Sequence, residues 1–155
     1  MTTANQASPG SASGCFTATT TSQSCSSPVT VSGDSTVVDA ARLMRDRDIG
    51  PVVVMDGEQV TGIITDRDIV VRAVADGQDP NSIAVQDVCT GDVEAVAPES
   101  PISDVVRRMQ QRNVRRLPVV DGDKLVGIIS MGDLAIEGEL PSSAMADVSA
   151  ASPNN

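Results

Sequence analysis

The sequence predicts an α/β sandwich made of two similar units that pack against each other. Apolar runs of strand length alternate along the chain with segments of helical periodicity, which is typical of a sheet covered by helices. The segment GIITDRD at 62–68 returns as GIISMGD at 127–133, 65 positions later and without a gap. Each unit alone is only marginally large enough to form a core. We therefore expect the two units to bury apolar faces against each other.

The first unit is expected to contain a strand, a helix, a hairpin and a second helix. Capping side chains mark helix starts, and an Asp-Gly pair between two apolar runs marks a hairpin. The expected elements are a strand near Val29–Val31, a helix from about Thr36 to Asp46 capped by Ser35, strands at Val52–Met55 and Val60–Ile64 joined by a turn at Asp56-Gly57, and a helix from Asp66 to about Ala75.

The second unit repeats this order. A Ser-Pro pair marks the start of its first helix, with the proline at the first helical position. The expected elements are a strand at Val93–Val96, a helix after Ser100-Pro101, strands at Leu117–Val120 and Leu125–Ile129 joined by a turn at Asp121-Gly122, and a short helix at Met131–Glu137.

Both ends of the chain are poor in large apolar groups, and we expect them to be disordered because they cannot bury enough surface to offset their ordering entropy. The predicted organisation is a tail at 1–27, a first unit at 28–76, a linker at 77–84, a second unit at 85–138 and a second tail at 139–155. The second unit opens with the lead-in segment Val85–Thr90, whose counterpart at 20–25 lacks its two valines. We therefore expect the first unit to be the less complete one.

Composition excludes several classes of function. The formal net charge of −10 argues against nucleic-acid binding, which relies on Lys and Arg at phosphates. No apolar stretch approaches the ~18 residues that span a membrane, and no signal-peptide pattern is present, so we expect a cytoplasmic protein. The chain has no histidine, and Cys15, Cys25 and Cys89 lack metal-ligand spacing, so no metal site is predicted. Without a Walker loop or a Gly-x-Gly-x-x-Gly motif, an enzyme is not expected.

The repeated motif resembles that of tandem CBS domains, the regulatory modules named for cystathionine β-synthase. The preceding stretches GPVVVMDG and RRLPVVDG also match this family. The resemblance implies two β-α-β-β-α units in a pseudo-twofold pair, with clefts that bind AMP, ADP, ATP or S-adenosylmethionine and no other cofactor. In such clefts the motif aspartate holds the ribose and the hydroxyl residue lies near the phosphate. By this similarity the ribose ligands are Asp68 and Asp133, and the hydroxyl contacts are Thr65 and Ser130.

The chemistry of these residues agrees with that role. A carboxylate accepts both vicinal hydroxyls of a ribose through charge-assisted hydrogen bonds. The alternative for Thr65 and Ser130 is a helix N-cap, which contributes about 1 kcal/mol. Arginine forks suit phosphate, and we name Arg115, Arg116 and Arg67 as candidate phosphate contacts, with a solvated surface position as the alternative for each.

The hypothesis is a non-catalytic regulatory module that senses an adenosine-type nucleotide. The alternative is a ligand-free protein-interaction or stress-response scaffold. The run Ile69-Val70-Val71 together with Ala73-Val74 is apolar on more than one helical face, which favours a homodimer. We also expect a separate effector protein as a partner, and neither nucleic acid nor membrane.

Overall fold

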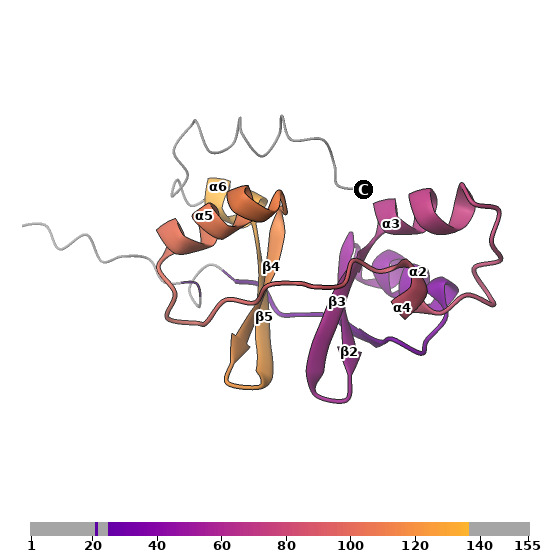
Figure 1. Ribbon diagram of the computed structural model, residues 1–155, viewed down its shortest axis with the longest axis horizontal. Coiled ribbons are helices and arrows are strands. Elements are labelled where there is room, and N and C mark those ends of the chain that lie inside the picture. The colour runs from indigo at the N-terminus through magenta and orange to yellow at the C-terminus, as the bar shows by residue number, and fades with distance from the viewer. Residues whose placement is uncertain (1–20, 22–24, 137–155) are drawn as a thin grey trace, which may run out of the picture.

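The computed structural model describes residue 21 and residues 25–136. The two predicted tails lie outside these residues, apart from residue 21 and residues 25–27. Figure 1 shows two units side by side, each with a sheet and helices packed on it, and β3 and β5 in contact where the units meet. The α/β sandwich that the sequence predicts is confirmed.

The first unit contains a three-stranded sheet in the order β1-β2-β3, with β1 parallel to β2 and β2 antiparallel to β3. Its elements are β1 (Thr30–Ser32), α2 (Val37–Arg47), β2 (Pro51–Asp56), β3 (Gln59–Thr65), α3 (Asp66–Asp68) and the π-helical segment η1 (Ile69–Val74). The hairpin turn consists of Gly57 and Glu58, one residue later than predicted, because Asp56 still belongs to β2 and pairs with Gln59. The predicted cap of α2 is wrong by one residue, because the Thr36 hydroxyl, rather than Ser35, accepts the Asp39 N–H at 3.3 Å.

The second unit contains a two-stranded sheet, β4 (Arg116–Asp121) with β5 (Lys124–Ser130), covered by α5 (Ile102–Arg112) and α6 (Met131–Ile136). The strand predicted at Val93–Val96 is reduced to one bridge, from Val96 to Val119. Glu94 of this segment is instead bound by Arg108 and Arg112 of α5.

The predicted cap of α5 is also wrong. Pro101 occupies the N-cap position and has no N–H, and its side chain accepts no hydrogen bond. The Ser100 hydroxyl accepts the Ala97 N–H at 3.1 Å and so closes the preceding turn.

In the described part of the chain the core has three parts, and their arrangement follows strand alternation. Val52, Val54 and Ile64 face the helices of the first unit, and Leu117, Val119 and Ile129 face those of the second. On the opposite faces, Val53, Ile63 and Ile128 form a smaller cluster between the units. Because both faces of β2 and β4 are covered, these strands are continuous apolar runs.

The lead-in segments are exchanged between the units. Helix α4 (Val85–Val88) inserts Val85 and Val88 into the core of the first unit, and Thr90 bridges to Ile63 of β3. Cys25 packs on the core of the second unit, and Ser26 bridges to Ile128 of β5. The expectation that the first unit lacks a lead-in is therefore wrong, because the segment before the second unit completes the first.

A glycine makes each of these bridges fit. A Cβ at Gly62 would lie 2.8 Å from the Thr90 carbonyl oxygen and 2.9 Å from the Cys89 sulfur. A Cβ at Gly127 would lie 2.6 Å from the Cys25 sulfur. The glycine of the repeated motif is thus explained by the close approach of a crossing segment.

Candidate functional site

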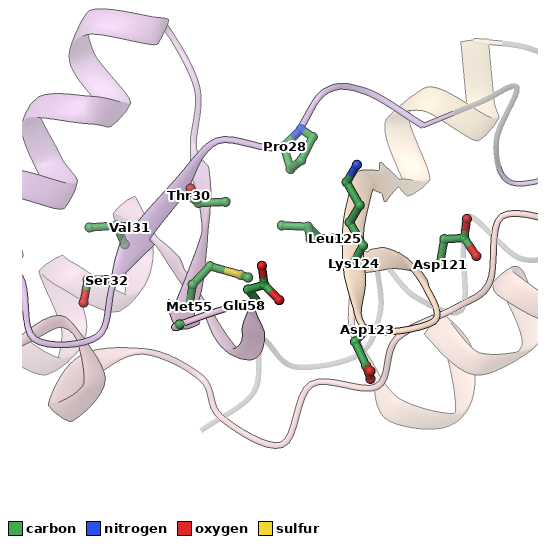
Figure 2. Close-up of a pocket in the computed structure, with 11 residues that line it drawn as sticks. Pro28, Thr30, Val31, Ser32, Met55, Glu58, Asp121, Asp123, Lys124 and Leu125 are labelled. Atoms are coloured by element: carbon green, nitrogen blue, oxygen red, sulfur yellow. The ribbon is translucent and has the colours of Figure 1, made fainter.

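A cavity of about 810 Å³ opens between the two hairpin turns. Figure 2 shows apolar side chains from Val31, Met55 and Leu125 together with charged side chains from both hairpins. The charged residues are Glu58, Asp121, Asp123 and Lys124. The lining includes none of the residues predicted to bind a ligand, which lie at the other ends of β3 and β5.

At the end of β3, Thr65 and Asp68 form a reciprocal capping box. The Asp68 Oδ2 atom accepts the Thr65 N–H at 2.9 Å and the Thr65 hydroxyl at 2.7 Å. The Asp68 N–H donates to the Thr65 hydroxyl oxygen at 3.3 Å. Thr65 is therefore the N-cap of α3, which is the alternative that the sequence left open.

At the end of β5, Ser130 and Asp133 repeat this geometry. Asp133 Oδ2 accepts the Ser130 N–H at 2.9 Å and the Ser130 hydroxyl at 2.7 Å, and the Asp133 N–H donates back at 3.2 Å. Both polar pairs are partly buried. The motif thus gives the two units the same local structure, held within four residues.

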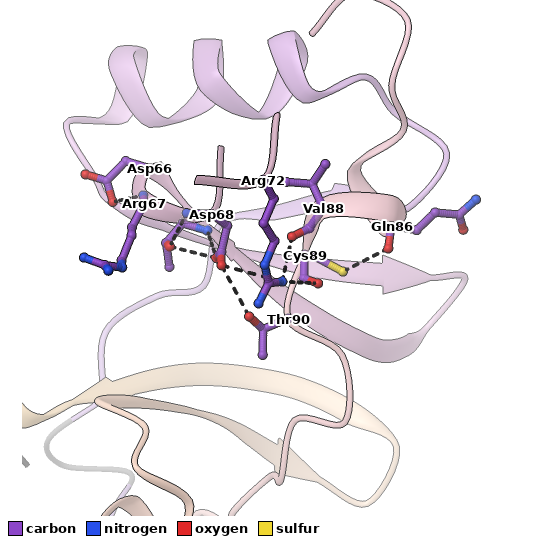
Figure 3. A network of polar contacts seen from close by, with 9 residues as sticks. Asp66, Arg67, Asp68, Arg72, Gln86, Val88, Cys89 and Thr90 are labelled. Atoms are coloured by element: carbon purple, nitrogen blue, oxygen red, sulfur yellow. Dashed lines mark hydrogen bonds and ion pairs between the residues drawn. The ribbon is translucent and has the colours of Figure 1, made fainter. Parts of the chain in front are cut away.

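The surroundings of Asp68 extend well beyond the motif (Figure 3). Its other carboxylate oxygen, Oδ1, accepts the Thr90 hydroxyl at 3.4 Å and lies 3.8 Å from Arg72 Nη1. Arg72 Nη1 also donates to the carbonyl oxygens of Val88 and Cys89, at 2.9 and 3.0 Å. We call Thr65, Asp68, Arg72 and Thr90 the first-unit site. Its side chains form hydrogen bonds with the segment that connects the two units.

The Asp133 carboxylate makes fewer contacts than that of Asp68. Within residues 25–136, Oδ1 of Asp133 has neither a hydrogen bond nor an ion pair. Arg116 is the cross-strand partner of Ser130, so both side chains lie on one face of the hairpin. Ser130, Asp133 and Arg116 make up the second-unit site.

The other two predicted arginines stand apart from the carboxylates. The Arg67 side chain is exposed, and in Figure 3 it points away from Asp68 on the side opposite Arg72. Arg115 is exposed, and its carbonyl oxygen accepts the N–H of Met131. The structure therefore places Arg116 beside a predicted hydroxyl, and leaves Arg67 and Arg115 at the periphery.

Sequence reasoning did not identify Arg72 or Thr90. Arg72 carries a detectable signal, because a basic residue four positions after an acid on a helix forms an ion pair. Thr90 carries none, because its contact with Asp68 depends on the crossing of the lead-in segment.

One thiol adjoins the first-unit site. Burial, and then the negative charge of Asp68, raise the pKa of the Cys89 thiol above its ordinary value. Cys89 is therefore a weak nucleophile near neutral pH, since the thiolate is the reactive form.

The described part of the chain holds no group of three or more Cys, Asp or Glu side chains placed to bind a metal ion. None of its helices is long and apolar enough to cross a membrane.

The sequence pattern of the CBS domain matches the chain twice, over residues 24–74 and 85–137. The chain belongs to the CBS domain family. CBS pairs of this kind are regulatory modules and carry out no catalysis.

Relatives of this CBS pair support the assignment. The CBS domain-containing protein YhcV of Bacillus subtilis is 36% identical over 123 residues, which are 77% of this chain and 87% of that protein. The hexameric CBS-CP12 protein from bloom-forming cyanobacteria is 31% identical, with a TM-score of 0.71 over 77% of this chain and 68% of that one. The CBS domain pair of MJ0100, solved in complex with 5′-methylthioadenosine and S-adenosyl-L-methionine, is 24% identical, with a TM-score of 0.70 over 77% of this chain and 99% of that one.

Proposed function

We propose that this CBS pair is a regulatory module that binds an adenosine-type ligand at the ends of β3 and β5. The ligand hydroxyls would be held by Asp68 in the first-unit site and by Asp133 in the second-unit site. Thr65 and Ser130 fix the two carboxylates through their Oδ2 atoms, so the Oδ1 atoms are the ones that meet the ligand.

The observation that carries this proposal is the unoccupied acceptor at Asp133. Its Oδ2 is held by two donors of Ser130, and its Oδ1 has no partner within residues 25–136. A carboxylate held in this way is preorganised and does not have to lose side-chain freedom when a hydroxyl donates to it. Hydroxyl donors to an ionised carboxylate form short, strong hydrogen bonds.

Adenosine derivatives are the first ligands to test. The MJ0100 pair, whose fold this chain shares, was solved with two of them. The panel is AMP, ADP, ATP and S-adenosylmethionine, with NAD as a larger relative.

Thermal unfolding of the full chain with each compound provides the test. A ligand present at 100 times its Kd stabilises the folded state by about 2.7 kcal/mol, which raises the Tm by several degrees for a domain of this size. Asp133→Ala is expected to lose the part of the shift that arises at the second-unit site, and Asp68→Ala the part from the first. Because each substitution also removes a cap, the quantity compared is the ligand-induced shift in Tm and not the Tm itself.

Asp104→Ala is the matched control, since Asp104 lies in the first turn of α5 and, among the described residues, its carboxylate forms an ion pair only with Arg107. It is expected to keep the full shift. If no compound in the panel raises the Tm, the ligand-sensor proposal is rejected and the ligand-free scaffold takes its place.

We also propose that the pair forms a homodimer through η1. Val70, Val71 and Val74 of this segment are 57%, 49% and 60% exposed, and together they form an apolar surface. The hexameric state of the related CBS-CP12 protein supports self-association. Analytical ultracentrifugation at micromolar concentration is expected to show a dimer, which Val74→Lys dissociates and Val126→Lys, on β5, does not. A monomeric unmodified chain would reject the dimer.

The separate effector protein and the cytoplasmic location stay predictions from the sequence. A pull-down with and without the compound that raises the Tm in the unfolding test would identify an effector protein by its ligand-dependent retention.

A further inference from the structure

We propose that the two sites select ligands of different charge. The second-unit site takes a phosphorylated nucleoside, and the first-unit site takes a nucleoside-type ligand that carries no phosphate. This inference rests on the proposed function and adds to it the ligand class of each site.

The two sites occupy the same position on matching hairpins. Pro51 is the cross-strand partner of Thr65, and Arg116 is the cross-strand partner of Ser130. Cross-strand partners present their side chains on one face of a sheet. Two residues before Thr65 and Ser130, Ile63 of β3 and Ile128 of β5 lie on this same face, in the cluster between the units. The residue beside the motif hydroxyl is thus Arg116 in the second unit and Pro51 in the first.

The protein does not neutralise Arg116, the cation of the second-unit site. Arg116 is half-buried, and in the described part of the chain neither it nor Arg115 forms an ion pair or a side-chain hydrogen bond. The motif contributes one carboxylate, Asp133, and the corresponding positions before it are Met131 and Gly132. Arg116 therefore lies beside the capped hydroxyl of Ser130 without a protein carboxylate of its own, which leaves its positive charge for a phosphate. The planar fork of arginine binds phosphate in a bidentate way.

The first-unit site has no such surplus. Its motif contributes two carboxylates, Asp66 and Asp68. Arg72 is held by two carbonyl oxygens and by Asp68. Arg67 points away from the carboxylate (Figure 3).

The position that Arg115 occupies in the second unit is Gly50 in the first. A Cβ added to Gly50 would lie 3.5 Å from the Asp66 carboxylate oxygen. A phosphate placed there would meet Asp66 in place of a guanidinium. Like charges in such proximity oppose binding.

The experiment measures each site alone by calorimetric titration of the full chain with adenosine and with AMP. Asp68→Ala leaves the second-unit site, and Asp133→Ala leaves the first-unit site. At the second-unit site AMP is expected to bind about tenfold or more tightly than adenosine, which is the range of a hydrogen bond to a charged group. At the first-unit site AMP is expected to bind no more tightly than adenosine.

Two substitutions then test whether the residue beside the motif hydroxyl causes the difference in ligand preference between the sites. Added to Asp68→Ala, Arg116→Gln is expected to bring the ratio of AMP affinity to adenosine affinity down toward one. Added to Asp133→Ala, Pro51→Arg is expected to raise that ratio at the first-unit site. Arg107→Gln, an exposed arginine of α5, is the control and is expected to leave the ratio as it was. Arg116→Gln in the otherwise unmodified chain gives a measurement that does not depend on how Asp68→Ala folds.

The outcomes separate the two proposals. Equal AMP-to-adenosine ratios at the two sites, or loss of AMP and adenosine affinity in equal measure with Arg116→Gln, would overturn charge selection and leave the ligand-binding proposal standing. Failure of the unmodified chain to bind either compound would remove both.

Discussion

The two units share a motif and differ in what surrounds it. Each unit closes its hairpin with a hydroxyl residue that caps a helix and is bound in return by an aspartate three positions later. In the first unit that aspartate also contacts Thr90 and Arg72, whereas Asp133 has no further partner in the described residues. A motif whose hydrogen bonds lie within four residues is retained when a unit is duplicated. Contacts with distant segments are free to diverge.

The sheets differ in the same way. β1 pairs with β2 over three residues, but its counterpart in the second unit makes one bridge. There, Arg108 binds Glu94 at 2.6 Å and so attaches the segment to α5. Symmetry of sequence therefore gives symmetry of hairpins, while the outer strand depends on side chains that the repeat does not share.

The largest expected effect comes from α4, which packs into the core of the first unit. Val88 is fully buried there, so Val88→Asp places an unpaired charge in the core and is expected to cost roughly 3–5 kcal/mol of folding free energy. Hydrogen exchange should show lost protection first in β2 and β3. Gln86→Asp, on the exposed side of the same helix, should have little effect. Lost protection confined to β4 and β5 would contradict the exchange of lead-in segments.

A smaller effect is expected at the two motif glycines. Gly62→Ala and Gly127→Ala are each expected to destabilise the protein by about 1–3 kcal/mol through overpacking. The Gly127 clash is mainly with the sulfur of Cys25, whereas the Gly62 clash includes a main-chain oxygen. Denaturant unfolding should therefore show partial rescue of Gly127→Ala by Cys25→Ala. Equal rescue of Gly62→Ala by Cys89→Ala would contradict this difference, because it would mean that a cysteine sulfur is the main obstacle at both glycines.

Arg72 should matter more than an ordinary surface arginine. Its side chain is 31% exposed and donates to two carbonyl oxygens, so Arg72→Met is expected to cost about 1–2 kcal/mol, after allowance for solvent screening. Arg107→Met, which breaks only an exposed ion pair, is the control and should change little. Urea unfolding midpoints provide the comparison. Equal changes in both variants would mean that Arg72 does not brace the first unit.

The smallest effect concerns Cys89, which adjoins only the first-unit site. Its pKa is raised by burial and then by Asp68, so the folded state keeps the thiol protonated to higher pH than the unfolded state does. The stability that this gives is present below the ordinary thiol pKa and is lost as pH rises through the folded pKa. Unfolding midpoints should therefore fall less toward alkaline pH in Cys89→Ala than in the unmodified chain.

Asp68→Asn provides a second measurement on the same thiol. It removes one cause of the raised pKa and should speed alkylation of Cys89 in a variant whose other two cysteines are serine. An unchanged alkylation rate would mean that Asp68 has no electrostatic influence on that side of the site.

Much of the local structure follows from short-range patterns. The two hairpins, the apolar strand runs and the hydroxyl–aspartate pairs each depend on residues a few positions apart, and each lies within one residue of where the sequence predicts it. The errors have other causes. Ser35 and Thr36 both have a capping hydroxyl, but only Thr36 lies three residues before Asp39, whose carboxylate binds that hydroxyl at 2.8 Å.

The sequence by itself determined the duplication, the hairpins and the capping pairs, because these features depend on residues that are close together in the sequence. Only the tertiary structure decided which unit each lead-in segment completes, because Val85 and Val88 fit either core by composition. It also decided that Arg72 and Thr90 meet Asp68 while Arg116 stands beside Ser130. These contacts form when distant segments cross, and their geometry is set by the packing of the two units and not by local preference.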